Sequence, residues 1–318
     1  DSIICGDFNA DGKMDLATAN SSNDNISVLL GIGDGAFHAA VNYSTGTSPI
    51  SITVGDFNKD GKLDVSTANV SVDEISILLG NGDGTFPTVQ NYSVGPGINP
   101  YSITAGDFNG DGNPDLATAN AGSNDISVLL GNGDGTFQAA VTYATGDGIT
   151  TGITPLSIVI GDFNGDGKRD LATANNSNDI SVVLGNGDGT FGTAVIYTAG
   201  NSPGAITTGD FNADGKPDLV AANVLDNNVS LFLGIGDGAF QAAVNYAVGN
   251  LPYAVIAGDF NKDGRPDLAV ANNGSDNASI LISVSNPSTY SIGGTVTTTA
   301  SSTLAGVTSR CTTPMGFP

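Results

Sequence analysis

The side chains best suited to chemistry in this chain are aspartates, set at fixed spacing in the segment GDFNxDGxxD, which occurs six times. In each copy, carboxylate or amide oxygens fall at positions 1, 3, 5 and 9 of a nine-residue loop that starts at the first Asp. Glycine at position 6 permits a sharp turn, and the backbone carbonyl of position 7 adds one more oxygen. Hard oxygen ligands at this spacing are typical of Ca²⁺ sites, so we expect about six calcium ions.

Each predicted site takes five ligands, of which the residue at position 7 contributes its carbonyl. The ligands are Asp7, Asn9, Asp11, Lys13 and Asp15; Asp56, Asn58, Asp60, Lys62 and Asp64; Asp107, Asn109, Asp111, Asn113 and Asp115; Asp162, Asn164, Asp166, Lys168 and Asp170; Asp210, Asn212, Asp214, Lys216 and Asp218; and Asp259, Asn261, Asp263, Arg265 and Asp267. The alternative is an Asx-rich turn without metal, but three carboxylates within nine residues repel one another unless a cation binds. Mg²⁺ is disfavoured because it demands a tighter octahedron. Such ions most often hold a hairpin together, so we expect a structural role.

The elements that position these loops repeat with them. The first aspartates of the copies are separated by 49, 51, 55, 48 and 49 residues, and each interval holds four strand-length segments divided by turn residues. Six such units in series predict an all-β fold, a β-propeller of six four-stranded blades. A two-sheet sandwich or a β-solenoid is the alternative packing. GNGDG predicts a glycine-rich hairpin turn, with a second metal or phosphate site as the alternative.

The sixth unit lacks the GNGDGTF turn and the strand after it. We therefore expect an incomplete last blade, completed by the C-terminal tail or by a neighbouring chain. The predicted domains are a calcium-binding propeller over residues 1–284 and a β-rich tail over residues 285–318.

Composition excludes several classes of partner. The chain has 318 residues with 32 acidic and 9 basic side chains, giving a net charge of −23, and every acidic residue except Glu74 is Asp. This charge repels nucleic acid and anionic membranes. No run of 18 apolar residues predicts membrane insertion, and no basic-then-apolar leader opens the chain. With 45 Gly and no Trp, we expect almost no helix.

The units resemble FG-GAP or VCBS repeats over residues 1 to about 284, on the strength of the six GDFNxDGxxD copies. Such repeats form the integrin α-subunit propeller and occur in fungal lectins and large bacterial surface proteins. The resemblance implies a calcium-binding propeller with a role in adhesion or, as in the lectins, in sugar binding between blades. The tail segment TYSIGGTVTTTASSTLAGVTS resembles the opening of an Ig-like domain of the carboxypeptidase-regulatory type, but it stops before such a domain is complete.

Catalysis needs residues that break the repeat, and few do so. They are His38, Glu74, Asp147, Arg169, Arg265 and Arg310. His38 falls on a fourth strand and is expected to be exposed rather than a base. No nucleophile elbow, His-metal cluster or phosphate-binding loop with Lys occurs. We therefore expect no enzyme activity.

Two non-enzymatic functions remain. The first is an extracellular structural or adhesion building block that forms filaments by donating a strand from its tail, so that its partner is a second copy. The alternative is lectin-like recognition of an extracellular protein or glycan, at a face that carries two long connectors, Gly95 to Pro100 and Gly146 to Pro155. Five tyrosines recur at the end of the fourth strand and are expected to pack rather than to bind sugar. These are Tyr43, Tyr92, Tyr143, Tyr197 and Tyr246.

Two features fit an extracellular or cell-surface location. Calcium sites of modest affinity are saturated where the ion is millimolar. Two cysteines alone leave the redox compartment undecided, and in the building-block hypothesis Cys5 and Cys311 form a bond within or between subunits. Nine Asn-x-Ser sequons are compatible with a glycoprotein. They start at Asn20, Asn25, Asn42, Asn69, Asn91, Asn175, Asn228, Asn273 and Asn277.

Overall fold

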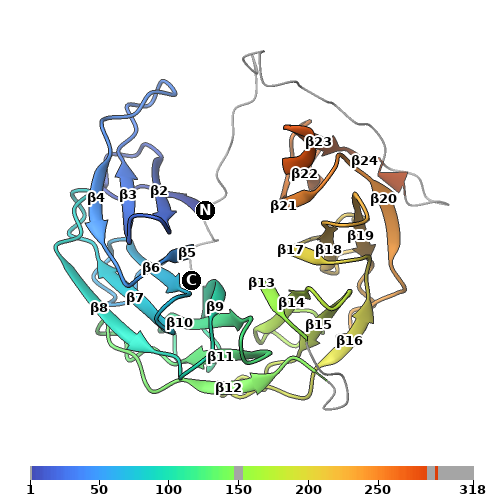
Figure 1. Ribbon diagram of the computed structural model, residues 1–318, viewed down its shortest axis with the longest axis horizontal. Helices are drawn as coiled ribbons and strands as arrows, with labels where there is room; N and C mark the ends of the chain where they lie inside the picture. Colours follow the sequence, from blue (N-terminus) through green and yellow to red (C-terminus); the bar gives the residue numbers. More distant parts are fainter. Residues whose placement is uncertain (1, 147–152, 285–290, 293–318) are drawn as a thin grey trace. The chain divides into compact units, whose positions relative to one another are not determined.

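The computed structural model describes residues 2–146, 153–284 and 291–292, and over these residues the fold is all-β (Figure 1). It is a six-bladed β-propeller in which five antiparallel sheets have four strands in sequence order and the last has three. Among the described residues the sole helical element is the 3-10 turn η1, Asn273–Ser275. No helix among them is long and apolar enough to cross a membrane. The predictions of six blades, of an incomplete sixth blade and of almost no helix are confirmed.

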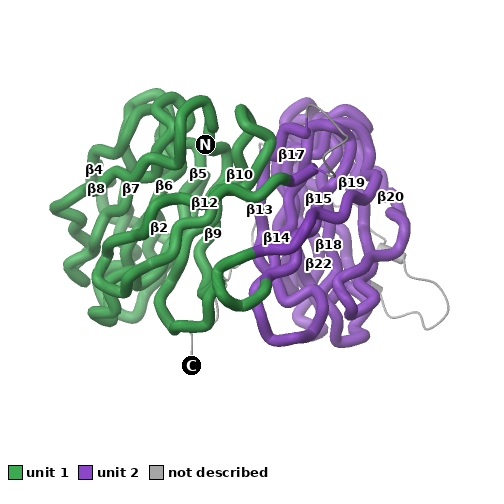
Figure 2. The backbone as a smooth tube through the Cα atoms, turned by 90° about the horizontal axis from the view of Figure 1, so that it is seen from below, with its two compact units in different colours: residues 1–144, 186–190, 310–318 green, residues 145–185, 191–309 purple. Residues whose placement is uncertain are grey.

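The chain divides into two compact units, coloured green and purple in Figure 2. The first unit, residues 1–144, 186–190 and 310–318, holds blades one to three. Blade one is β1 (Ser2–Gly6), β2 (Asp15–Asn20), β3 (Asn25–Leu29) and β4 (Val41–Ser44). Blade two is β5 (Pro49–Gly55), β6 (Asp64–Asn69), β7 (Glu74–Leu79) and β8 (Thr88–Ser93). Blade three is β9 (Pro100–Gly106), β10 (Asp115–Asn120), β11 (Asp125–Leu129) and β12 (Val141–Ala144).

The second unit, residues 145–185 and 191–309, holds the strands of blades four to six. Blade four is β13 (Pro155–Gly161), β14 (Asp170–Asn175), β15 (Asp179–Val183) and β16 (Val195–Thr198). Blade five is β17 (Pro203–Gly209), β18 (Asp218–Asn223), β19 (Asn228–Phe232) and β20 (Val244–Ala247). Blade six is β21 (Pro252–Gly258), β22 (Asp267–Asn272) and β23 (Asn277–Leu281). A separate two-stranded ladder joins β24 (Ser283–Val284) to β25 (Ser291–Ile292).

The core lies between successive blades. In the first unit, Ala17 and Ile26 of blade one pack in one cluster with Ile52 and Leu78 of blade two. The repeated segment DLATAN is buried along its whole length in blades three and four. The fourth strands are mostly exposed. In the second strands small alanines alternate with β-branched or other apolar residues, which favours close approach of neighbouring sheets.

The predicted boundary at residue 284 stays a prediction, because residues 285–290 and 293–318 lie outside the described residues. The same holds for the predicted completion of the last blade by the tail.

Candidate metal site

Each acidic loop connects the first strand of a blade to the second, and its oxygen atoms are arranged by the loop backbone. In blade one, the Asp11 N–H donates to Asp7 Oδ1 and to Asn9 Oδ1, both at 3.1 Å, and the Gly12 N–H donates to Asp7 Oδ2 at 2.8 Å. The Lys13 N–H donates to Asp11 Oδ1 at 2.9 Å. The same bonds recur in the other loops, for example around Asp56 and Asp60. The oxygens of positions 1, 3 and 5 are therefore fixed in place by the turn itself.

The fourth side-chain ligand predicted for each loop, the Asp at position 9, is fully buried in every blade. Asp115 accepts the Phe108 N–H through Oδ2 at 2.8 Å and the Gly131 N–H through Oδ1 at 2.7 Å. Because Phe108 lies in the acidic loop and Gly131 follows the third strand, this carboxylate ties the two hairpin connections of one blade together. Equivalent pairs of bonds are made by Asp15, Asp64, Asp170, Asp218 and Asp267.

The pKa values of the buried aspartates depend on burial and on the other carboxylates of their loops. Burial raises the pKa of Asp64 to about 6; the Gly80 and Phe57 N–H groups oppose this rise, while the charges of Asp56 and Asp60 add to it. The pKa values of Asp115 and Asp218 are raised to about 6 for the same reasons. At position 5, the Lys168 N–H holds the pKa of Asp166 below its ordinary value. The three carboxylates of a loop are thus close enough to repel.

The donor chemistry of the loops fits a calcium ion. Positions 1, 3, 5 and 9 offer carboxylate or amide oxygens. Most of them accept one backbone N–H and keep a second lone pair, whereas Asp107 Oδ1 and Asp267 Oδ2 each accept two backbone N–H groups. The Lys13 ammonium lies 3.1 Å from Asp11 Oδ2, a cation already drawn to the same carboxylate. No group of three His, Cys, Asp or Glu side chains in the described part of the chain is arranged to hold a metal, since position 3 is Asn and position 9 faces backbone N–H groups. Calcium therefore stays a prediction supported by donor type.

A second contact, which occurs four times, joins the acidic loops of blades one to four to the GNGDG-type turn of the following repeat, and we call it the blade junction. It consists, at its first occurrence, of Phe8, Tyr43, Gly84 and Phe86. The Gly84 N–H donates to the Phe8 carbonyl at 2.9 Å, and the Tyr43 hydroxyl donates to the Gly84 carbonyl at 3.4 Å. The Phe86 ring meets those of Phe8 and Tyr43 edge-on, with centroids 5.7 and 5.6 Å apart. The GNGDG turn is therefore a hairpin, as predicted, whose glycine binds the previous blade.

The packing role predicted for the tyrosines is confirmed at these junctions. Tyr92 meets Phe137 and Tyr197 meets Phe240 edge-on, at 5.6 and 5.7 Å. Burial raises the pKa values of Tyr43, Tyr92 and Tyr143 above the ordinary value.

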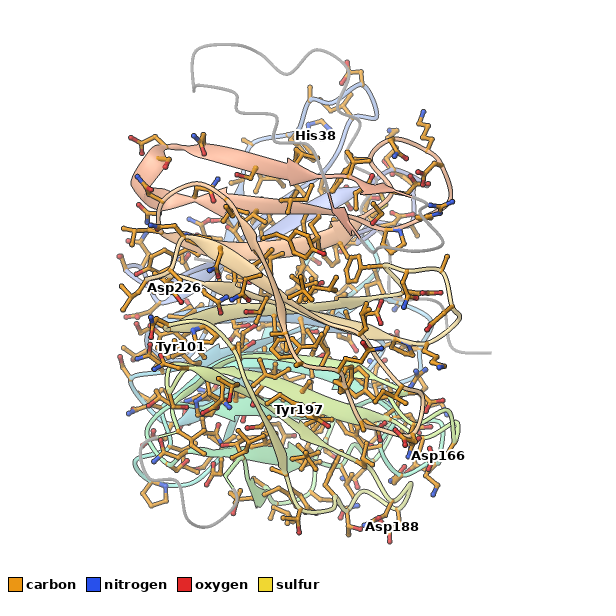
Figure 3. All side chains as sticks on the ribbon, turned by 90° about the vertical axis from the view of Figure 1, so that its right-hand side faces the viewer. His38, Tyr101, Asp166, Asp188, Tyr197 and Asp226 are labelled. Atoms are coloured by element: carbon orange, nitrogen blue, oxygen red, sulfur yellow. The ribbon has the colours of Figure 1, made fainter. Side chains whose placement is uncertain are left out.

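The opposite end of each blade uses acidic side chains differently. There, in blades one, two and five, the turn between the second and third strands carries an Asp that accepts N–H groups from a connector between blades. Asp73 accepts from Gly97 N and Asn99 N of the connector to the next blade, both at 2.7 Å, and Asp226 accepts at 2.8 Å from Asn201 N of the connector from the previous blade. Figure 3 shows Asp166 of an acidic loop and Asp226, both in the second unit, at opposite ends of the strands.

The basic residues that the structure describes all lie in the acidic loops. Eight of the nine Lys and Arg residues lie within the nine-residue loops, and the ninth, Arg310, is outside the described residues. They are Lys13, Lys59, Lys62, Lys168, Arg169, Lys216, Lys262 and Arg265. The other end of each described blade therefore carries acidic side chains without a cation.

The residues that break the repeat do not come together as a catalytic set among the described residues. His38 is exposed, as predicted, but it precedes the fourth strand, which begins at Val41, so its predicted place on that strand is wrong. Asp147, Arg310 and Cys311 lie outside the described residues, and so does most of the long connector from Gly146 to Pro155. In the other long connector, Gly95 to Pro100, the Ile98 side chain is buried and packs in the hydrophobic core. Cys5 is disulfide-bonded.

Sequence reasoning missed two functions of repeated residues. It treated the Asp at position 9 as a metal ligand alone, although its buried carboxylate also joins two turns. It treated the last glycine of GNGDG only as a turn former, although that glycine binds the preceding blade. The available signal was that Phe8, Gly31 and Gly84 have counterparts in nearly every unit.

Among the sequons, Asn69 and Asn175 are buried, while Asn42 and Asn91 are exposed on fourth strands.

Fold and loops together define a β-propeller built from six repeats, each with an acidic loop between its first and second strands. The family model for the FG-GAP-like repeat matches residues 7–67, 60–118, 110–173, 162–221 and 210–270, and that for the FG-GAP repeat matches residues 251–291. The chain belongs to the FG-GAP repeat family. No curated protein matches it significantly.

Solved structures share the fold at low identity. A protein from Lactobacillus plantarum has a TM-score of 0.69 and 18% identity, with 94% of this chain and 85% of that chain covered. The periplasmic gluconolactonase of Pseudomonas aeruginosa has a TM-score of 0.66 and 16% identity, covering 93% and 84%. Virginiamycin B lyase from Staphylococcus aureus, solved with quinupristin, has a TM-score of 0.61 and 18% identity, covering 89% and 80%. At these identities the likeness concerns the fold alone.

Proposed function

We propose that this chain is an extracellular, calcium-stabilised building block for structure or adhesion, without catalytic activity. The observation that carries the proposal is the sixfold repetition of one acidic loop. In each copy the N–H of position 6 donates to the carboxylate of position 1, and the N–H of position 7 donates to the carboxylate of position 5. A catalytic centre needs a residue set that occurs once, whereas a set repeated in every blade serves the scaffold. Millimolar calcium outside cells would fill such loops.

The calcium ion would be held by the residues at positions 1, 3, 5, 7 and 9 of each loop. When bound, it would neutralise three carboxylates that otherwise repel. The chain's own residues would orient the ligands through the N–H groups of positions 5, 6 and 7. The buried Asp at position 9, which is hydrogen-bonded to both connections of its blade, would link the metal-filled loop to the turn after the third strand and restrict the motion of both.

Assembly is the finer part of the proposal. β23 is the outer strand of the three-stranded sixth sheet, and an unpaired strand edge accepts a further strand. Copies that exchanged a tail strand at this edge would form a head-to-tail chain. Electron microscopy of the purified chain in millimolar Ca²⁺, repeated after chelation, tests this. Filaments are expected in calcium, while single particles under every condition would contradict assembly.

Activity and metal binding are tested separately. Isothermal titration of the chelated protein is expected to give about six sites per chain for Ca²⁺ and weaker binding of Mg²⁺. The absence of calcium binding would contradict the proposal. Because a gluconolactonase and a lyase share the fold, lactone hydrolysis by the purified chain, lost on substitution of a residue outside the repeat, would contradict the non-enzymatic part.

A second candidate, glycan recognition, is favoured by two exposed tyrosines. Tyr101 and Tyr253 occupy the same position after the proline that opens a first strand, and they are 44% and 58% exposed. Exposed aromatic rings are common platforms for sugars and other ligands. Binding of the chain to a glycan array, reduced by Tyr101→Ala and Tyr253→Ala but not by Tyr92→Phe at a blade junction, would support this function over the first.

A further inference from the structure

Asparagine followed directly by glycine occurs six times in the chain, and this dipeptide can react with itself. The backbone nitrogen of the glycine can attack the side-chain carbonyl carbon of the asparagine, because glycine has no Cβ to hinder the approach. The six pairs begin at Asn81, Asn109, Asn132, Asn164, Asn186 and Asn273. All of them lie among the described residues, so their hydrogen bonds can be compared.

The reaction, deamidation, needs only water and solvent base. The glycine N–H loses its proton, and the nitrogen forms a bond to the asparagine Cγ. The bond from Cγ to the side-chain nitrogen breaks, and ammonia leaves with a proton from water. Water then opens the cyclic imide at either carbonyl, which gives aspartate or isoaspartate, and no atom is oxidised or reduced. In isoaspartate the backbone runs through the former side chain.

Two kinds of hydrogen bond oppose this reaction. A glycine N–H that donates to a fixed acceptor loses its proton less readily, and an asparagine amide that donates is not free to turn its Cγ toward the nitrogen. Four pairs have one such bond. The Gly274 N–H donates to the Asn250 carbonyl at 3.0 Å. In three turns the asparagine amide donates at 2.9 Å to the threonine Oγ1 four residues later, at Asn81, Asn132 and Asn186.

The acidic loop of blade three has both kinds of bond. The Gly110 N–H donates to Asp107 Oδ1 at 2.7 Å, and the Asn109 amide donates to Asp111 Oδ2 at 3.0 Å. This second oxygen is open to the amide because position 7 of the loop is Asn113 rather than a lysine. Attack of the Gly110 nitrogen on Asn109 would therefore break two hydrogen bonds to carboxylates.

The acidic loop of blade four has the same segment, FNGDG, but neither bond. Its position 7 is Lys168, whose ammonium lies 3.3 Å from Asp166 Oδ2, the place that the asparagine amide takes in blade three. Neither the Asn164 amide nor the Gly165 N–H donates to any residue that the structure describes. Gly165 is exposed, and Figure 3 shows Asp166 of this loop at the end of the strands.

One bond is common to both loops and does not distinguish them. The N–H of position 5 donates to Oδ1 of the asparagine at 3.0 Å, from Asp111 to Asn109 and from Asp166 to Asn164. The difference therefore lies in the amide nitrogen and in the glycine N–H, which are the two groups that take part in the reaction.

Charge acts in the same direction. Positions 7 and 8 are Lys168 and Arg169 in blade four, and Asn113 and Pro114 in blade three. Loss of the glycine proton puts negative charge on the backbone, and a nearby cation stabilises that charge whereas nearby carboxylates oppose it. The nine residues of the loop in blade three include three aspartates and no basic residue.

We propose that Asn164 is a site of spontaneous deamidation, and that the residue at position 7 makes it react faster than Asn109. Aspartate at this place adds a fourth carboxylate to the loop, while isoaspartate lengthens the backbone by one atom and displaces the side-chain oxygen. The effect of either product on metal binding rests on the proposed calcium site, but the reaction itself does not.

Incubation of the folded, full-length chain in warm neutral buffer with chelator, followed by peptide mapping with mass spectrometry, tests the site. Asn164 is expected to convert about five- to tenfold faster than Asn109, which must give up hydrogen bonds to charged groups. In the urea-unfolded chain, the control, the two rates are expected to be similar. Equal rates in the folded chain, or the same ratio after unfolding, would overturn the inference.

Exchange of the residues at position 7 tests the cause. Lys168→Asn is expected to slow the conversion of Asn164 several-fold, because the amide gains Asp166 Oδ2 as an acceptor. Asn113→Lys is expected to accelerate the conversion of Asn109 for the opposite reason. In each variant the unchanged loop is the internal reference. Unchanged rates in both variants would show that position 7 does not determine which asparagine reacts.

An incubation in millimolar Ca²⁺ separates this inference from the proposed function. If Asn164 Oδ1 binds the ion, conversion of Asn164 should be several-fold slower than in chelator. Equal rates with and without calcium would contradict the role of Asn164 as a metal ligand, while the deamidation itself is decided by the rates in chelator alone.

Discussion

At the residue scale, the Asp at position 9 combines a structural role with the proposed metal role, and the two are separable. We predict that Asp115→Asn lowers the free energy of unfolding by about 2 kcal/mol with or without calcium, because the buried amide cannot accept both N–H groups without turning its own donor toward one of them. Asp111→Asn, at the exposed position 5, is expected to cost little in chelator. Urea unfolding of both variants, in Ca²⁺ and in chelator, measures the difference.

Two results of these unfolding measurements would contradict the prediction. If Asp115→Asn loses stability only in the presence of Ca²⁺, the buried carboxylate acts as a ligand and not as a link between turns. If Asp111→Asn destabilises the chelated protein as much as Asp115→Asn, the loop needs its charge for reasons other than metal binding.

A second prediction at this scale concerns a buried amide oxygen. Thr118, Thr67 and Thr173 each donate a hydroxyl to the Oδ1 of the Asn two residues later, at 2.8 to 2.9 Å. In blade six Val270 replaces this threonine, and Asn272 Oδ1 is buried without a partner among the described residues.

We therefore predict that Val270→Thr, nearly equal in shape, stabilises the protein by about 1 kcal/mol. The reverse change in blade three, Thr118→Val, is expected to destabilise by a similar amount because it leaves Asn120 Oδ1 unpaired. Thermal unfolding of the two variants checks the signs. Destabilisation by both would show that the orphaned oxygen of Asn272 costs nothing.

Part of this chemistry was predictable from the sequence. The spacing of Asp7, Asn9 and Asp11 predicts a turn with convergent oxygens, and the structure has that turn. The spacing does not tell which way the Asp15 side chain faces. An Asp whose carboxylate accepts two backbone N–H groups and an Asp that binds a metal look identical in the sequence. The burial that decides between them comes from the following strands.

At the scale of elements, the repeat predicted nearly everything about the strands. Alternation of apolar residues and the Gly, Asn and Asp turns place β1 at Ser2–Gly6 and repeat the four-strand pattern through blade five. The contacts between blades were not predictable in the same way. The N–H of Gly84 binds Phe8 across 76 positions of sequence, and nothing in the local pattern of either turn specifies the partner.

The blade junction therefore gives a prediction for elements. Gly84 has a φ of +82°, and a Cβ there would lie 2.7 Å from a methyl of Leu30 in the preceding blade. Gly84→Ala is expected to lose about 1 to 2 kcal/mol from the left-handed backbone, and more from the contact with Leu30. Gly97→Ala is the control, with a φ of +71° and open space around its Cβ. Urea unfolding should show the larger loss for Gly84→Ala; equal losses would mean that the junction tolerates a side chain.

At the scale of the whole molecule, repulsion among the negative charges destabilises the folded state, and bound calcium would reduce that repulsion. The chain carries −23, and six Ca²⁺ ions would add 12 positive charges, leaving −11. The relief would act at the acidic-loop end of each blade, where the described basic residues also lie. At the other end, Asp24, Asp73 and Asp226 accept backbone N–H groups from connectors, and Asp125 and Asp179 accept side-chain donors of their own turns. Repulsion among loops is therefore the main electrostatic cost that a cation can remove.

Sodium and calcium ions can both reduce this repulsion, sodium by screening and calcium by binding at specific sites, and the final prediction distinguishes the two effects. Sodium chloride screens exposed charges, with a Debye length of about 10 Å at 0.1 M and about 3 Å at 1 M, so it should raise the unfolding temperature of chelated protein gradually. Calcium bound at specific sites should act at millimolar concentration, adding about 2.7 kcal/mol per site when its concentration is about a hundred times Kd. Once the loops are filled, added salt should have little further effect, because the carboxylates are already neutralised. Thermal unfolding over a grid of NaCl and CaCl₂ concentrations measures both. Equal stabilisation by calcium and by sodium chloride of the same ionic strength would mean that the loops attract cations only as a diffuse atmosphere, and the six acidic loops would then be turns whose charge is tolerated rather than used.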